Sequence, residues 1–292
     1  MIYDIRLAIT YSYERPAGAG RSMLRLMPAD LPGEQRRLAG VLAIEPPAYE
    51  RREMTDFFGN GAVEVAFREV QADITFRIAA RIERIAEAPG FDISPDLARL
   101  AVEIAEYHAL DAEAPHHFVG ASPRVAPLAE VTAYARSRTA GARTAFETVG
   151  ALGRALHEDM LYDPDATNVD TPPSEAFALR HGVCQDFAQV MIAGLRGLGV
   201  PAGYVSGFLR TSPPAGQARL EGADAMHAWV RAWCGRETGW IEYDPTNAVM
   251  VGSDHVVVAR GRDYGDVAPV KGVLRLTGGQ KTDQAVDVLP IL

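Results

Sequence analysis

The alternation of apolar and polar positions marks the beginning of the chain as β-structure. A period of two, typical of a strand with one buried face, runs through Ile5, Leu7, Ile9, Tyr11 and Tyr13. Gly59-Asn60-Gly61 is the expected hairpin turn between residues 54–58 and 63–67, and the alternation returns over residues 74–78. We therefore predict an N-terminal antiparallel β-domain over residues 1–90, with a supporting or partner-binding role.

A helical spacing of three and four residues replaces this alternation in the middle of the chain. Ser94-Pro95-Asp96 predicts a helix start, with Ser94 as N-cap and Pro95 at the first helical position. Similar spacing predicts helices over residues 125–138 and 144–160. We assign these helices to a second domain that spans residues 91–292 and includes the strands at the C-terminus.

The pattern is sharpest after residue 173, where two helices precede three strands. The predicted helices are Ser174–Arg180 and Cys184–Leu198, and Gly199 ends the second. The predicted strands are Gly203–Arg210, Met226–Trp233 and Gly239–Asp244. Thr211–Asp224 is rich in Pro, Gly and Ala, as loops that border a substrate cleft often are. The expected fold class is α+β.

Composition narrows the classes of function. The chain has 292 residues, of which 48% are hydrophobic, so it has enough material for two cores. A net charge of −9 argues against nucleic-acid binding, which needs a basic surface. Two cysteines are too few for a disulfide scaffold, and we find neither a leader pattern nor an apolar run that would span a bilayer. We expect a soluble, cytoplasmic protein with no membrane or nucleic-acid partner.

Cys184 is the leading candidate for chemistry. It begins a predicted helix and the apolar stripe of that helix. Unpaired N–H groups and the helix dipole at this position favour a thiolate, which is the nucleophilic form of cysteine. A lone cysteine is more often a small apolar core residue. The functional reading therefore depends on its partners.

His227 and Asp244 are the expected partners. A two-residue turn at Gly235-Arg236 would pair Cys234 with Glu237, and counting back along both strands places His227 directly opposite Asp244. A one-residue slip, for example at a bulge on Gly239, would separate the two. Because side chains alternate between the two faces of a strand, Cys234 lies on the face opposite to His227, so we expect it to be structural. A zinc site from both cysteines and His227 is not expected, because closely spaced ligand pairs are absent.

These segments as a set resemble the bacterial transglutaminase-like proteins. The segments that carry the resemblance are Gly182-Val183-Cys184-Gln185-Asp186-Phe187-Ala188, Ala202–Phe208, His227-Ala228-Trp229-Val230 and Trp240–Asn247. The β-rich start also resembles the N-terminal domain of that group, and Gly261–Val267 resembles its C-terminal signature.

The resemblance implies a papain-like core, in which the cysteine helix packs on an antiparallel sheet. It implies that Cys184 is the nucleophile, His227 the general base and acid, and Asp244 the residue that orients His227. No cofactor or metal is implied. The Cys184 N–H is a natural oxyanion donor, whereas the sequence assigns no second donor.

Other polar residues receive structural interpretations. Asp186 lies in the first turn of the helix, where a carboxylate favours the dipole, and Trp229 is expected to be a packed aromatic. His116, His117 and His255 have no charged pattern around them, so we expect them at the surface.

The combined prediction is a cysteine-dependent enzyme that acts on a peptide or protein amide through a thioester. Hydrolysis is favoured over transfer to an amine, because no feature of the sequence specifies an amine acceptor. Two alternatives remain open. One is an acyltransferase that depends on an amine as acceptor or on a thioester as donor. The other is a non-catalytic binding module on the same fold.

Overall fold

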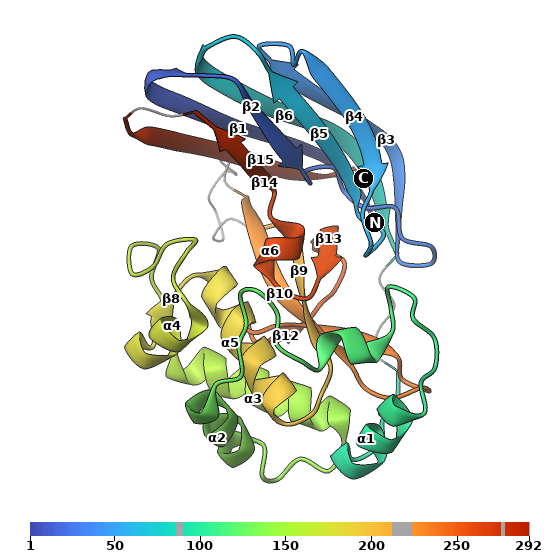
Figure 1. The fold of residues 1–292 in the computed structure, drawn as a ribbon. Helices are drawn as coiled ribbons and strands as arrows, with labels where there is room; N and C mark the ends of the chain where they lie inside the picture. Colours follow the sequence, from blue (N-terminus) through green and yellow to red (C-terminus); the bar gives the residue numbers. More distant parts are fainter. Residues whose placement is uncertain (86–89, 212–223, 276–277, 292) are drawn as a thin grey trace, which may run out of the picture.

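The computed structural model describes residues 1–85, 90–211, 224–275 and 278–291. Most of the predicted loop Thr211–Asp224 lies outside these residues. An all-β part and a mixed part of helices and sheet lie one above the other in Figure 1. The α+β fold class is therefore confirmed.

The all-β part consists of two four-stranded antiparallel sheets. Its N-terminal strands are β1 (Ile2–Ala17), β2 (Gly20–Leu24), β3 (Gln35–Glu45), β4 (Glu50–Thr55), β5 (Gly61–Phe67) and β6 (Gln71–Arg84). The sheet orders are β15-β1-β6-β3 and β14-β2-β5-β4. The alternating residues Ile5, Leu7 and Ile9 are buried, as their period predicts, and β4 and β5 form the expected hairpin.

The C-terminal strands, which the sequence analysis assigns to the second domain, pair with strands of these two sheets. β14 (Val270–Leu274) pairs with β2, and β15 (Gln280–Ile291) pairs with β1 from Ile2↔Ile291 to Tyr13↔Gln280. Figure 1 shows both strands, in red, beside the blue N-terminal strands. The physical reason is that β1 would otherwise be a long, unpaired edge. A pairing between the two ends of a chain leaves no local signal in the sequence.

Helices pack against the second sheet. The helices of this part are α1 (Leu97–Ala105), η1 (Pro115–Phe118), α2 (Ala129–Arg138), α3 (Ala145–Asp159), α4 (Pro173–Leu179), α5 (Cys184–Gly197) and α6 (Tyr264–Val267). The predicted helices are present, but Asp96 rather than Ser94 caps α1, because its side chain accepts the Arg99 N–H at 2.8 Å. No helix in the described part of the chain is long and apolar enough to cross a membrane.

The second sheet is antiparallel and has the order β12-β11-β10-β9-β13. Its strands are β9 (Ala202–Leu209), β10 (Ala225–Trp233), β11 (Trp240–Asp244), β12 (Val249–Met250) and β13 (His255–Gly261), while β7 (Leu161–Tyr162) and β8 (His181–Gly182) form a separate parallel pair. The α5 helix packs against β9 and β10, and its apolar residues share one core with theirs. The predicted arrangement of a cysteine helix on an antiparallel sheet is confirmed.

Two side-chain amides of the N-terminal region cover the outer edge of β13. Gln35 exchanges two hydrogen bonds with the backbone of Val257, at 2.8 and 2.9 Å. Asn60 does the same with the backbone of Arg260, at 2.8 Å in both directions. These amides supply the donors and acceptors that a further strand would supply, so the all-β part is hydrogen-bonded to the second sheet.

Candidate active site

Cys184 is the first residue of α5 and is half-buried. The turn before it depends on Gly182, because a Cβ there would lie 2.6 Å from Oδ2 of Asp186. The absence of that Cβ lets the Asp186 carboxylate fold back and accept the Val183 N–H at 2.8 Å. Asp186 therefore stabilises the start of the helix, and burial raises the pKa of its carboxyl group.

His227 lies between Cys184 and Asp244. Its Nε2 is 2.8 Å from Oδ2 of Asp244, and both side chains are buried. Burial lowers the pKa of His227, but hydrogen bonds to Asp244 and Cys184, together with their negative charges, raise it from 6.5 to about 10. The imidazole is therefore held in its charged form between a thiol and a carboxylate.

The hairpin that carries His227 and Asp244 has a different register from the predicted one. Val230 pairs with Tyr243, and Trp233 pairs with Trp240. The two-residue turn at Gly235-Arg236 is wrong, because the connection is longer and closes with a hydrogen bond from the Cys234 N–H to the Gly239 carbonyl at 2.8 Å. The shift amounts to two residues, so it leaves every side chain on its predicted face. His227 and Asp244 are diagonal rather than direct neighbours, and they still hydrogen-bond.

Asp244 is held by donors on both oxygens. Its Oδ1 accepts the backbone N–H groups of Thr246 and Asn247 at 2.9 and 3.2 Å. Its Oδ2 accepts the side-chain amide of Asn247 at 2.7 Å in addition to His227. Burial alone would raise the pKa of Asp244, but the donated hydrogen bonds and the charge of His227 hold it far below the usual carboxyl range. The carboxylate therefore stays ionised and fixed in orientation.

His255 also binds Asp244, which corrects its predicted surface position. It is only 5% exposed, and its Nε2 lies 3.2 Å from Oδ2 of Asp244. The Gly252 N–H points at the other ring nitrogen at 3.4 Å, which favours the tautomer that donates from Nε2. No sequence motif marks His255, because β13 reaches the site only through its pairing with β9. His116 and His117 are half-buried rather than exposed.

His227, Asp244 and His255 form a cluster whose side chains could hold a metal ion. The ligand atoms of His227, Asp244 and His255 lie within 4.8 Å of one another. Both imidazoles already hydrogen-bond to one carboxylate oxygen, so a metal would have to displace the protons that hold the cluster together. Cys234 lies outside this cluster. It is fully buried, and burial raises its pKa well above that of an ordinary thiol.

Trp229 connects the cluster to the all-β part. Its ring contacts those of His227 and His255, with centroids 6.2 and 5.2 Å away. Its indole N–H donates to Glu242 at 2.8 Å, and Glu242 pairs with Arg260 at 2.6 Å. Arg260 in turn binds Glu34, which lies just before β3. Trp229 is therefore both the packed aromatic that the sequence predicts and the first member of a chain of polar contacts that reaches the half-exposed Glu34.

Two tyrosines that the sequence analysis did not single out lie close enough to Cys184 to respond to its charge. Burial, and then the negative charge of Cys184, raise the pKa of both Tyr162 and Tyr204. Tyr162 is largely exposed on β7, whereas Tyr204 is buried on β9. Both phenols therefore stay neutral hydrogen-bond donors at neutral pH.

Comparison with protein families matches both parts of the chain. The model described as "Transglutaminase-like superfamily" matches residues 132–245, and the model "Bacterial transglutaminase-like N-terminal region" matches residues 3–83. The first range contains the cysteine helix and the hairpin, and the second contains the N-terminal strands of the all-β part.

Relatives extend over nearly the whole chain. An uncharacterized protein of Mycobacterium tuberculosis is 32% identical over 295 residues, which cover 97% of this chain and 88% of the relative. A protein of Pseudomonas aeruginosa named protein-glutamine gamma-glutamyltransferase is 34% identical over 131 residues, which cover 44% of this chain and 19% of that protein. A solved structure described as a "Putative Cysteine Protease" from Cytophaga hutchinsonii has a TM-score of 0.76 at 22% identity, and the match covers 99% of this chain and 90% of the other. That likeness concerns the fold.

Proposed function

This chain belongs to the transglutaminase-like superfamily, and on that premise we propose that it is a cysteine-dependent acyl-transfer enzyme that acts on peptide or protein amide bonds. The observation that carries the proposal is the position of His227, which hydrogen-bonds to Asp244 and whose pKa is raised by the neighbouring Cys184 as well as by Asp244. A thiol, an imidazole and a carboxylate in this order are the components of nucleophilic catalysis at a carbonyl.

In the first half-reaction, the Cys184 thiolate, paired with the imidazolium of His227, attacks the amide carbon. The tetrahedral oxyanion is stabilised by the Cys184 N–H, because the first N–H groups of a helix have no partner within the helix. The imidazolium then gives its proton to the leaving amine as the C–N bond breaks, and a thioester remains on Cys184. Asp244 stays ionised throughout and stabilises the charged imidazole.

In the second half-reaction, neutral His227 removes a proton from the incoming nucleophile, which attacks the thioester. Cys184 leaves as a thiolate, and His227 returns to its charged form. We propose water as the usual nucleophile, which makes the enzyme a hydrolase. Transfer to an amine is the second candidate, and the similarity of residues in the core to a relative named protein-glutamine gamma-glutamyltransferase favours it.

The test is to trap the acyl-enzyme. The protein is mixed with a peptide library, quenched in acid and examined by intact-mass and peptide mass spectrometry. We expect an acyl adduct on Cys184 in the wild type and in Cys234→Ala, and none in Cys184→Ala. Products released with and without a biotinylated amine then separate hydrolysis from transfer. Equal adduct in Cys184→Ala, or no adduct with any peptide, would overturn the proposal.

A further inference from the structure

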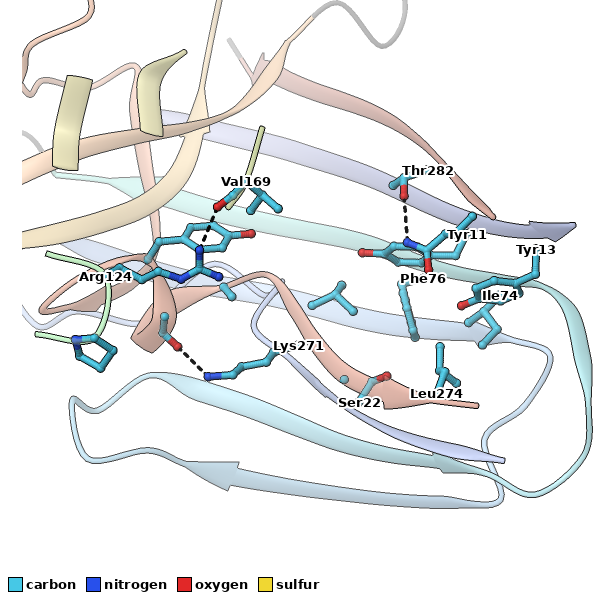
Figure 2. Close-up of a pocket in the computed structure, with 17 residues that line it drawn as sticks. Tyr11, Tyr13, Ser22, Ile74, Phe76, Arg124, Val169, Lys271, Leu274 and Thr282 are labelled. Carbon is cyan, nitrogen blue, oxygen red and sulfur yellow. Dashed lines mark hydrogen bonds between the residues drawn. The ribbon is translucent and has the colours of Figure 1, made fainter. Parts of the chain in front are cut away.

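A cavity of about 560 Å³ lies between the all-β part and the catalytic core. On one side it is lined by β1, β6, β14 and β15 of the two sheets. On the other side it is lined by the loop at Pro123-Arg124, by Val169 and by the segment from Tyr264 to Ala268. Figure 2 shows these side chains converging on one space. The all-β part therefore supplies much of the wall of a site, in addition to supporting the core.

The two ends of the cavity differ in chemistry. Figure 2 shows one end formed by Tyr11, Tyr13, Ile74, Phe76 and Leu274, which are aromatic or aliphatic. The other end carries two cations: Arg124, which lies beside Val169, and Lys271, which points at the Gly265 carbonyl. A ligand that fits both ends has an apolar group and a negative charge.

The described residues that line the cavity carry positive charges and no negative ones. None of the described residues that line the cavity is an Asp or a Glu, although the chain as a whole carries a net charge of −9. Arg124 donates to the Val169 carbonyl at 3.1 Å, and its other nitrogen pairs with the exposed Asp170 at 3.0 Å. Lys271 reaches only the Gly265 carbonyl at 3.4 Å, and no carboxylate pairs with it in the part of the chain that the structure describes. Its ammonium group is available to an anion.

Cys184 does not line the cavity, but two contacts lead from the lining residues towards it. The Val169 carbonyl accepts the side-chain amide of Gln185 at 3.2 Å, and Gln185 directly follows Cys184 in α5. The ring of Tyr264 packs against that of Tyr204 in the central sheet, with centroids 6.1 Å apart. The cationic end of the cavity is therefore the end beside the start of the cysteine helix.

We propose that this cavity binds the substrate of Cys184 and that the substrate is an anionic, peptide-like amide. Its carboxylate binds at Lys271 and Arg124, and its aromatic or aliphatic group enters the space between the two sheets. The volume suits a short peptide or a capped amino acid. The identification of the ligand as a substrate rests on the proposed function, whereas its binding does not require catalysis.

Binding is measured with the full-length Cys184→Ala protein, in which the thiol is absent. The probes are N-(2-naphthoyl)-glutaminyl-glycine, which has a free carboxylate, and the matching glycinamide, which does not. Fluorescence anisotropy of the naphthyl group should show that the carboxylate binds about tenfold more tightly, as one charge-assisted contact provides. Lys271→Met should abolish most of this preference.

Lys281 provides the matched control, because it is the only other lysine in the chain. It lies on β15 between the lining residues Gln280 and Thr282, with its side chain on the other face of the strand and paired with Asp283 at 3.2 Å. Lys281→Met should keep the carboxylate preference. Thr282→Trp, which fills the cavity, should weaken both probes, whereas Lys281→Trp should weaken neither. Equal affinity for the two probes, or equal effects at Lys271 and Lys281, would overturn the proposal.

A second measurement connects the cavity to Cys184. In the wild type, the carboxylate probe should slow the alkylation of Cys184 by iodoacetamide, and the glycinamide at the same concentration should slow it less. An alkylation rate that neither probe changes would overturn the link between cavity and nucleophile. Selective binding of the carboxylate without any acyl-enzyme would instead overturn the proposed function and leave the binding site standing.

Discussion

The two faces of β10 differ in what holds them in place. The even-numbered face is apolar and packs into the core that includes α5; it consists of Met226, Ala228, Val230 and Ala232. The odd-numbered face carries polar groups, and three of them bind carboxylates: His227 binds Asp244, Trp229 binds Glu242, and Arg231 binds Glu113. The even-numbered face is held in place by close packing of its side-chain volume. The odd-numbered face is held in place by hydrogen bonds to particular partner residues.

This difference separates stability from function within one strand. An apolar side chain contributes through the area that it buries, so a smaller side chain costs folding free energy wherever it lies on the even face. A buried charge is tolerated only with its partner, so the odd face is restricted in identity as well as in size. Substitutions on the two faces should therefore change different measurements.

The largest expected effect follows from His227→Gln on the odd face. The amide keeps a hydrogen-bonding group near Asp244 but cannot exchange protons with Cys184, so kcat/KM should fall at least about 10³-fold. The control is His108→Gln at an exposed histidine, and equal activity of the two variants would remove His227 from the mechanism.

The next effect is expected from Val230→Ala on the even face. Loss of two buried methyl groups should lower the free energy of unfolding by about 2 kcal/mol in urea titrations. The value of kcat per folded molecule should be unchanged. Val273→Ala, at a valine that is 80% exposed on β14, is the matched control and should stay within about 0.5 kcal/mol of the wild type. A fall in kcat for Val230→Ala would show that the two faces are not independent.

A smaller effect is expected at His255, which binds the odd face through Asp244. His255→Phe removes one donor to the carboxylate and should lower kcat/KM about tenfold, the worth of one hydrogen bond to a charged group. His255→Gln retains an N–H donor and should recover part of that loss. If both variants lose activity equally, His255 has a packing role and does not position Asp244.

The last expected effect is the dependence of stability on pH. The pKa of His227 in the folded protein, about 10, lies above its ordinary value of about 6.5. Its contribution to stability is therefore complete below pH 6.5 and is lost as the pH rises towards 10. The difference in unfolding free energy between the wild type and His227→Gln should shrink across this window. A constant difference would mean that His227 is not charged in the folded protein.

The sequence predicts the parts of this molecule that depend on local patterns. The period of two predicts the buried residues of β1, and Gly199 correctly marks the end of α5 within two residues. The prediction that His227 and Asp244 lie on the same face of the hairpin is correct although the predicted turn is wrong. The register differs by two residues and not by one, which leaves each side chain on its face. Side-chain direction along a strand is a local property, whereas the length of a turn is not.

The sequence does not predict contacts between distant segments. His255 reaches Asp244 because β13 pairs with β9, which no local pattern around His255 encodes. The cavity joins Tyr11 to Arg124 and Lys271 across most of the chain, and it exists only because β14 and β15 return to the N-terminal sheets. These features depend on topology, which a single sequence without an alignment leaves open.

The pairing of β1 with β15 also sets an order of events during synthesis on the ribosome. β1 and β2 can pair with β6 and β5 early, but each lacks its second neighbour until β15 and β14 have been made, after the whole helical part. The region that is translated first is therefore completed last. Until then the nascent chain presents two open sheet edges, and the walls of the tyrosine-lined cavity are incomplete. Full assembly of this cavity must wait until the chain has emerged as far as β15.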